Sequence, residues 1–203
     1  MAYESEIAFF IDDRDFYVDK ILWLGFEKKF EKEQLDMMFD TPDADLWLKQ
    51  DSKIRLRVED GKVELTFKWK PFVTSGFAKR VELNIPLSVQ DIDKYKLFFE
   101  SIWYPLLFQL KKERISYRKW NVAIEFDNYP ILWWRIEIEW PENEIQELWE
   151  NLFPWEKYEF KYLSDFFLDH MSKTGKSIEE LKSEYFVNSG FDVGNIEKIL
   201  YYG

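Results

Sequence analysis

One hairpin sequence constrains the fold of this chain more than any other feature. Residues 53–59 and 62–70 alternate between apolar and charged side chains, and an Asp-Gly pair at 60–61 separates them. Asp-Gly between two alternating runs is the strongest short-range signal for a β-hairpin. Because successive side chains of a strand point to opposite faces, Arg55 and Arg57 share one face. We therefore expect a sheet with one charged face and one apolar face.

The alternation returns along the chain and predicts the rest of the sheet. Residues 27–40 carry apolar side chains near strand spacing, and the periodicity predicts further strands over 4–11, 78–85, 106–118, 120–127 and 131–140. Helices are predicted over 13–24, 88–103 and 142–152, and the tail from residue 160 has helical spacing in pieces. The fold class is therefore α+β, and the expected architecture is an eight-stranded antiparallel β-barrel with surrounding helices.

Composition excludes several classes of protein. Aromatic residues make up 20% of the 203 residues, which provides too much buriable ring surface for a disordered chain. There is no cysteine and only one histidine, which excludes disulfide frameworks, thiol catalysis and multi-histidine metal sites. The net charge of -11 argues against binding of duplex DNA. The sequence starts without a signal-peptide pattern and contains no membrane-spanning run, which predicts a cytoplasmic protein that does not bind membranes.

The charged strand faces have two interpretations. In a half-exposed antiparallel sheet the charged side chains face water, which is the commoner case. In a closed barrel covered by helices, the same side chains would line a lumen. A lumen with arginines, lysines and carboxylates could hold a polyanion such as a triphosphate, because guanidinium groups match phosphate oxygens and carboxylates hold divalent cations. The alternation by itself leaves both interpretations open.

A set of motifs resembles the CYTH superfamily, whose members are also called triphosphate tunnel metalloenzymes. The run LDMMFDTPDADLWLKQDSKIRLRVEDGKVELTFK at 35–68 is similar to the aromatic DTP element of that family, followed by its arginine strand, Gly turn and ELTxK strand. The later elements AKRVELNIP, KKERISYRKW, EFD, RIEIE and KYLSDFF follow in the family's order. The resemblance covers about residues 4–167 and implies an eight-stranded antiparallel tunnel.

The resemblance also implies an activity and a set of site residues. The family includes thiamine, inorganic and RNA triphosphatases and class IV adenylyl cyclases, so the chain is expected to be a divalent-metal-dependent phosphohydrolase acting on a triphosphate-containing small molecule or nucleotide. The residues expected to contact phosphates are Arg55, Arg57, Lys68, Arg80, Lys112 and Arg114, and the first four are the predicted catalytic residues. The residues expected to hold Mg²⁺ or Mn²⁺ are Glu6, Asp127, Glu137 and Glu139.

One departure from the family pattern leaves alternative functions open. The family begins with Glu-x-Glu-x-Lys, and a gapless alignment places Glu6, Ala8 and Phe10 at those positions. In this register the second glutamate and the lysine are absent, and the ring of Phe10 is expected to enter the lumen. A slip of two residues would use Glu4 and Glu6 and place Ala8 at the lysine position, so the lysine is absent in either register. The alternatives are a class IV-like nucleotidyl cyclase and a non-catalytic protein that binds a nucleotide or polyphosphate.

The sequence predicts two segments. Residues 1–171 form the tunnel domain suggested by the resemblance, and residues 172–203 form a helical C-terminal extension outside it. Residues 178, 181, 185 and 186 of the extension are apolar and have amphipathic spacing. That stripe could cover the tunnel wall, close one tunnel mouth or dock a second subunit, so a homodimer is possible.

Overall fold

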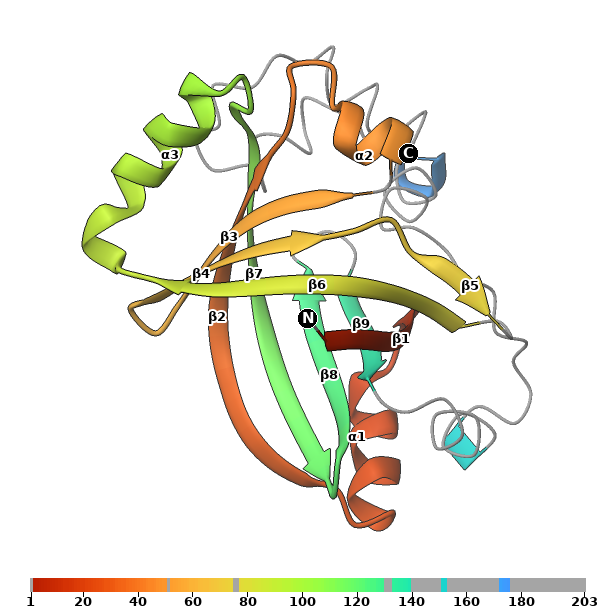
Figure 1. Cartoon of the computed structure of the whole chain (residues 1–203). Coiled ribbons are helices and arrows are strands. Elements are labelled where there is room, and N and C mark those ends of the chain that lie inside the picture. Colours follow the sequence, from red (N-terminus) through yellow and green to blue (C-terminus); the bar gives the residue numbers. More distant parts are fainter. Residues whose placement is uncertain are drawn as a thin grey trace.

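The computed structural model describes residues 2–50, 52–74, 77–129, 133–139, 151–152 and 172–175. Its strands form one curled antiparallel sheet (Figure 1). The sheet contains eight longer strands and the three-residue strand β5. The strands are β1 (Ala2–Ile11), β2 (Glu27–Phe39), β3 (Lys53–Glu59), β4 (Lys62–Lys68), β5 (Phe72–Thr74), β6 (Phe77–Leu87), β7 (Leu106–Lys119), β8 (Val122–Tyr129) and β9 (Trp133–Glu139). This confirms the predicted α+β class and antiparallel architecture.

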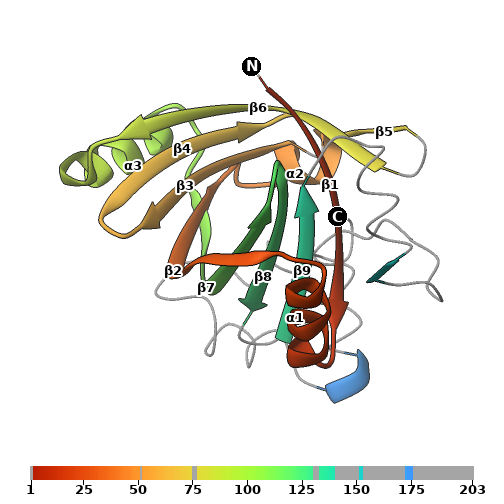
Figure 2. The ribbon, with the colours of Figure 1, turned by 90° about the horizontal axis from the view of Figure 1, so that it is seen from below.

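The first strand closes the sheet into a ring. The order of the strands is β1-β9-β8-β7-β2-β3-β4-β6-β5, and β1 pairs with β6 as well as with β9. Residues 2–6 of β1 lie opposite β6, while residues 6–11 lie opposite β9. The view from below shows the strands following one another around this curled sheet (Figure 2). The short strand β5 pairs with residues 77–79 of β6.

Apolar packing lies on the outer face of the ring, in two clusters. Helix α1 (Arg14–Trp23) places Ile21 against the outward side chains of β1, β7, β8 and β9, among them Ile7 and Ile124. Helix α3 (Ile92–Ser101) places Phe99 against β2 and β3, where its ring lies 4.8 Å from that of Phe39. Ile21 and Ile124 are fully buried. These helices cover parts of the wall, so the core of the protein lies outside the lumen.

Polar side chains fix the helix starts. The carboxylate of Asp13 accepts a hydrogen bond from the backbone N–H of Phe16 and caps α1, as its sequence position predicts. The buried Asp40 accepts bonds from the backbone N–H groups of Thr41, Leu46 and Trp47 at 2.6–2.9 Å. These bonds tie the end of β2 to the short helix α2 (Asp45–Gln50). The sequence Thr-Pro-Asp at 41–43, which is typical of a turn, therefore leads directly into this helix.

Most predicted boundaries agree with the structure to within a few residues. The region predicted as one helix over 88–103 contains a 3₁₀ turn, Val89–Asp91, before α3. The predicted strand over 78–85 continues through Pro86, and β5 was not predicted. Most of the predicted helix over 142–152 and most of the tail lie outside the described residues, so the division at residue 171 stays a prediction. Within the described part of the chain, no helix is long and apolar enough to span a membrane.

Candidate functional site

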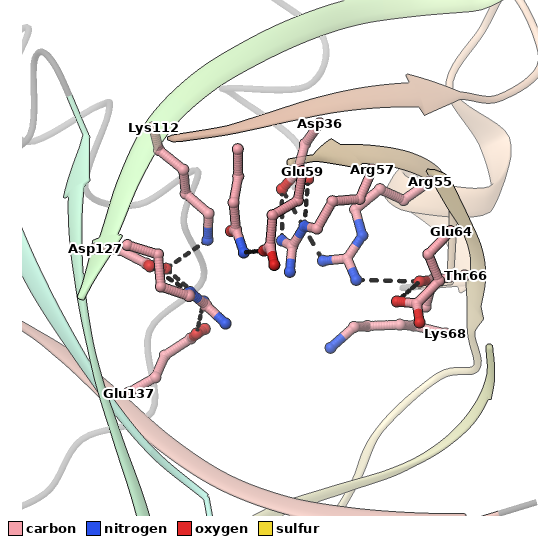
Figure 3. Close-up of polar contacts among 12 residues, drawn as sticks. Asp36, Arg55, Arg57, Glu59, Glu64, Thr66, Lys68, Lys112, Asp127 and Glu137 are labelled. Carbon is pink, nitrogen blue, oxygen red and sulfur yellow. Dashed lines mark hydrogen bonds and ion pairs between the residues drawn. The ribbon is translucent and has the colours of Figure 1, made fainter. Parts of the chain in front are cut away.

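Burial identifies the charged strand faces as the lining of the ring. Arg80, Lys112 and Asp127 have exposed fractions of 3%, 3% and 0%. Solvent-facing side chains on a half-exposed sheet would be far more accessible. The commoner interpretation of the alternation, with charged residues facing water, is therefore wrong for these strands. The side chains labelled in Figure 3 point toward one another across the inside of the sheet.

The predicted phosphate-binding residues are distributed around this inner face. They come from four strands: Arg55 and Arg57 from β3, Lys68 from β4, Arg80 from β6, and Lys112 and Arg114 from β7. The predicted metal ligands occupy the neighbouring strands, with Asp127 on β8, Glu137 and Glu139 on β9, and Glu6 on β1. The fold thus brings residues separated by more than 100 positions onto one surface, although their functional roles stay predictions.

One end of the inner face is organised by Asp36, which the sequence analysis did not select. Its carboxylate accepts two hydrogen bonds from Arg57, at 2.6 Å from Nε and 2.7 Å from Nη2. Arg55 Nη1 lies 4.0 Å from Asp36 Oδ2, and Arg55 Nη2 donates to Thr66 Oγ1 at 3.1 Å. Burial would raise the pKa of Asp36, but the charges of Arg57 and Arg55 outweigh it and hold that pKa well below its usual value. Asp36 is therefore ionised; it fixes the Arg57 guanidinium by two hydrogen bonds and lies at ion-pair distance from Arg55.

A second network joins β7, β8 and β9. Asp127 accepts hydrogen bonds from Lys112 at 2.5 Å and from Arg114 Nε and Nη2 at 2.6 Å each. Arg114 also pairs with Glu137, which in turn pairs with Arg135. Burial, followed by the charge of Arg114, lowers the pKa of Lys112 to about 8 despite the opposing effect of Asp127. Lys112 is thus a lining cation whose charge changes in the mildly alkaline range.

Arg135 was missed as a site residue, although the alternation could have found it. It shares its strand face with Glu137 and Glu139, and its guanidinium donates a hydrogen bond to Glu137. Glu125 was also missed, although it lies two residues before Asp127 on β8 and therefore shares its strand face. The buried Glu125 accepts hydrogen bonds from Ser116 at 3.1 Å and from Arg118 at 2.7 Å.

Strand β1 pairs with β9 along the residues where its sequence departs from the family pattern. Glu6 lies opposite Glu139, Ala8 opposite Glu137, and Phe10 opposite Arg135. The ring of Phe10 lies 6.3 Å from that of Tyr129, whose hydroxyl lies 3.4 Å from Lys112 Nζ. This contact supports the expectation that Phe10 faces the lumen. The positions where the resemblance expects a glutamate and a lysine are therefore apolar.

The predicted metal-binding carboxylates have the right chemistry for a hard divalent cation, but two of them already form ion pairs with lysine and arginine side chains. Mg²⁺ and Mn²⁺ prefer carboxylate oxygens, and Glu6 and Glu139 occupy paired positions on adjacent strands. Asp127 and Glu137, however, are held by Lys112, Arg114 and Arg135. Among the residues that the structure describes, no three acidic or histidine side chains gather into a metal-binding group. A metal ion would have to share these carboxylates with the arginines.

The fold and the inner face together define a class of protein. It is a tunnel of antiparallel strands that keeps its apolar core outside and its arginines, lysines and carboxylates inside. The sequence model of the CYTH domain matches residues 2–165. The chain belongs to the CYTH family, as the motifs predicted.

Similar proteins are known from archaea and from a plant. A Methanocaldococcus jannaschii protein whose name proposes adenylate cyclase activity is 28% identical over 144 residues, which cover 71% of this chain and 80% of that protein. A Pyrococcus horikoshii structure has a TM-score of 0.65 at 24% identity, covering 82% of this chain and 98% of that one. A Hippeastrum protein described as having a dominant triphosphatase activity has a TM-score of 0.60 at 16% identity, covering 88% and 98%. At these identities the two structures show a shared fold.

Proposed function

We propose that this protein binds a triphosphate-containing small molecule inside the ring and hydrolyses it with the help of Mg²⁺ or Mn²⁺. The observation that carries this proposal is the burial of guanidinium and ammonium groups from several strands around one interior space. Burying unpaired cations is costly, and proteins keep such groups where a ligand or a partner carboxylate compensates them. A chain of three phosphates offers the several negative oxygens that such a lining can bind.

The lining residues would act mainly by positioning and charge neutralisation. Arg55 and Arg57 present planar forks that can donate two parallel hydrogen bonds to a phosphate. Arg114 has its Nη1 group left to donate, because Asp127 and Glu137 accept from its Nε and Nη2 groups. Asp36 holds Arg57 in one orientation before the ligand arrives, which reduces the entropic cost of binding. In the reaction, the oxygen of a water molecule bonds to the terminal phosphorus while the bridging P–O bond breaks, and the water's protons pass to the products.

The ion pairs of the lining favour a triphosphate that binds together with a divalent cation. Arg57, Lys68, Arg114 and Arg135 each face a carboxylate, so part of their positive charge is compensated within the protein. Glu6, Asp127, Glu137 and Glu139 are the residues that would hold Mg²⁺ or Mn²⁺. Such an ion, when bound, supplies positive charge that polarises a phosphoryl group. The protein's own contribution is to orient these carboxylates beside the basic residues.

A release assay tests the proposal. The full-length protein is incubated with tripolyphosphate, thiamine triphosphate or ATP, with Mg²⁺, with Mn²⁺ or with EDTA, and inorganic phosphate is measured. We expect metal-dependent release from at least one compound and loss of release in a Glu137→Ala, Glu139→Ala variant. Absence of release from all three compounds would reject hydrolysis. Binding of an intact compound without product would then identify the protein as a non-catalytic binder.

Cyclisation is the second candidate, because a relative carries a name that proposes adenylate cyclase activity. The same basic lining would hold ATP, but the ribose 3′-hydroxyl would attack the α-phosphorus and pyrophosphate would leave. The ATP reactions of the release assay distinguish the two activities when their products are separated by chromatography. Cyclic AMP with pyrophosphate indicates a cyclase, whereas ADP with phosphate indicates hydrolysis.

The lowered pKa of Lys112 predicts how binding depends on pH. In the ligand-free protein Lys112 loses its proton as the pH rises through about 8, and a neutral amine no longer attracts phosphate. The affinity for tripolyphosphate should therefore fall by up to about tenfold per pH unit above pH 8. Calorimetric titrations at pH 7, 8, 9 and 10 measure this slope. A Lys112→Arg variant keeps its charge and should show a flatter curve; an identical slope in both proteins would contradict the assignment.

A further inference from the structure

The wall of the ring formed by β1 and β9 differs from the other walls in its charge. Neither strand contains a basic residue apart from Arg135, and β1 places Ala8 opposite Glu137 and Phe10 opposite Arg135. In the strand order around the ring, β9 lies four strands from β3, on the opposite side. Arg135 therefore lies across the lumen from the arginines of β3.

The head group of Arg135 lies within the ion-pair network of the lining. It donates to Glu137, whose other oxygen accepts from Arg114, and the Arg135 side chain is 14% exposed. Burial would raise the pKa of Glu137, but the charges of Arg135 and then Arg114 keep it well below its usual value. The two arginines thus share one ionised carboxylate, as Arg55 and Arg57 share Asp36 across the ring.

The backbone pairing of β9 with β1 explains how a cation on β9 can lie beside β1, which has no basic residue. Arg135 and Phe10 are direct cross-strand neighbours. Directly opposed side chains have Cβ atoms about 4.5–5.5 Å apart. An arginine on β9 can therefore reach the space beside position 10, where the resemblance expects a lysine. The Phe10 ring packs toward Tyr129.

We propose that Arg135 is a phosphate-binding residue of this protein and supplies the positive charge that strand β1 lacks. This inference rests on the proposed function, because it assigns a further residue to the same site. Its ligand is one end of a triphosphate chain whose remaining phosphates contact the basic residues of β3 and β7. Glu137 positions the guanidinium in the ligand-free state and is shared with Arg114.

The competing explanation is that Arg135 only compensates the buried charge of Glu137. Both roles predict that loss of Arg135 lowers stability, so stability alone does not separate them. Moving the positive charge from β9 to β1 does separate the two roles. A Phe10→Lys, Arg135→Met double variant moves the cation from β9 back to the paired position on β1. A phosphate-binding role predicts that this double variant recovers affinity, because the charge again faces the same part of the lumen.

The test measures binding of tripolyphosphate by calorimetry in EDTA, using full-length proteins whose folding is checked by circular dichroism. We expect Arg135→Met to weaken binding at least tenfold, Arg135→Lys to weaken it less than fivefold, and the double variant to bind within fivefold of the original protein. Lys111→Met, on the opposite face of β7, is the control and should bind normally. If Arg135→Met does not fold, Arg135→Lys and the double variant carry the test.

Two results would overturn the inference. One is binding by Arg135→Met within twofold of the original protein, and the other is a folded double variant that binds at least tenfold more weakly than the original. Failure of the proposed function has a different signature. In that case the original protein does not bind tripolyphosphate, or Arg57→Leu binds it as well as the original does.

Discussion

Replacing Asp127 with alanine is expected to lower the free energy of unfolding by about 3–5 kcal/mol. Asp127 has an exposed fraction of 0% and accepts hydrogen bonds from Lys112 and from two nitrogens of Arg114. Its removal leaves two buried cations beside each other without the carboxylate that separates their charges. A cation cannot recover its hydration inside the ring, so the cost falls on the folded state.

Urea unfolding followed by tryptophan fluorescence measures this change. Glu33→Ala is the matched control, because Glu33 pairs with Lys111 on the outer surface, where the two side chains are 73% and 54% exposed. Exposed pairs contribute at most about 1 kcal/mol, so the control should remain close to the original protein. A loss below about 1 kcal/mol for Asp127→Ala would contradict the buried network described here.

Replacing Arg57 with leucine should weaken binding of tripolyphosphate about 100-fold, which corresponds to about 2.8 kcal/mol. Arg57 offers a planar fork already fixed by Asp36, and charge-assisted hydrogen bonds of this kind contribute about 1.5–3 kcal/mol. Calorimetry with tripolyphosphate in EDTA measures the affinity. The change should exceed that of any outer-face variant, because the proposed site lies on the inner face.

Asp36 complicates this experiment, because Arg57→Leu leaves that buried carboxylate with fewer partners. An Asp36→Asn, Arg57→Leu double variant removes the orphaned charge and separates lost phosphate contacts from local rearrangement. If the double variant regains the original affinity, Arg57 acts through Asp36 rather than on the ligand. If both variants bind as tightly as the original protein, Arg57 is not part of the site.

Local sequence patterns predicted the strands well, because the alternation and the turn residues of a hairpin lie within one short stretch of sequence. The alternation in KIRLRVE and KVELTFK, together with Asp60–Gly61, gave β3 and β4 within two residues. Pairing of β1 with both β6 and β9 could not be derived in this way. It joins residues up to about 130 positions apart, and nothing in a ten-residue strand specifies which distant edges it will meet.

Alternation and resemblance selected most of the charged residues that the fold places on the inner face, but they did not select Asp36 or Arg135. Arg55, Arg57 and Lys112 stand out by alternation and by resemblance. Asp36 did not stand out, because a single acid within the apolar run LDMMF has no local signature, and its role depends on the register that places it opposite Arg57. Side-chain pairing across strands is a property of the assembled sheet.

The closure of the ring by β1 has a consequence for the timing of folding. Strand β1 is synthesised before the other strands of the ring, yet one of its partners, β9, ends at Glu139. Synthesis proceeds at about 5–20 residues per second, so the N-terminal strand waits several seconds or more before its partner exists. The last seam of the ring thus joins the oldest strand to one of the youngest, and pairings of such long separation make folding slow.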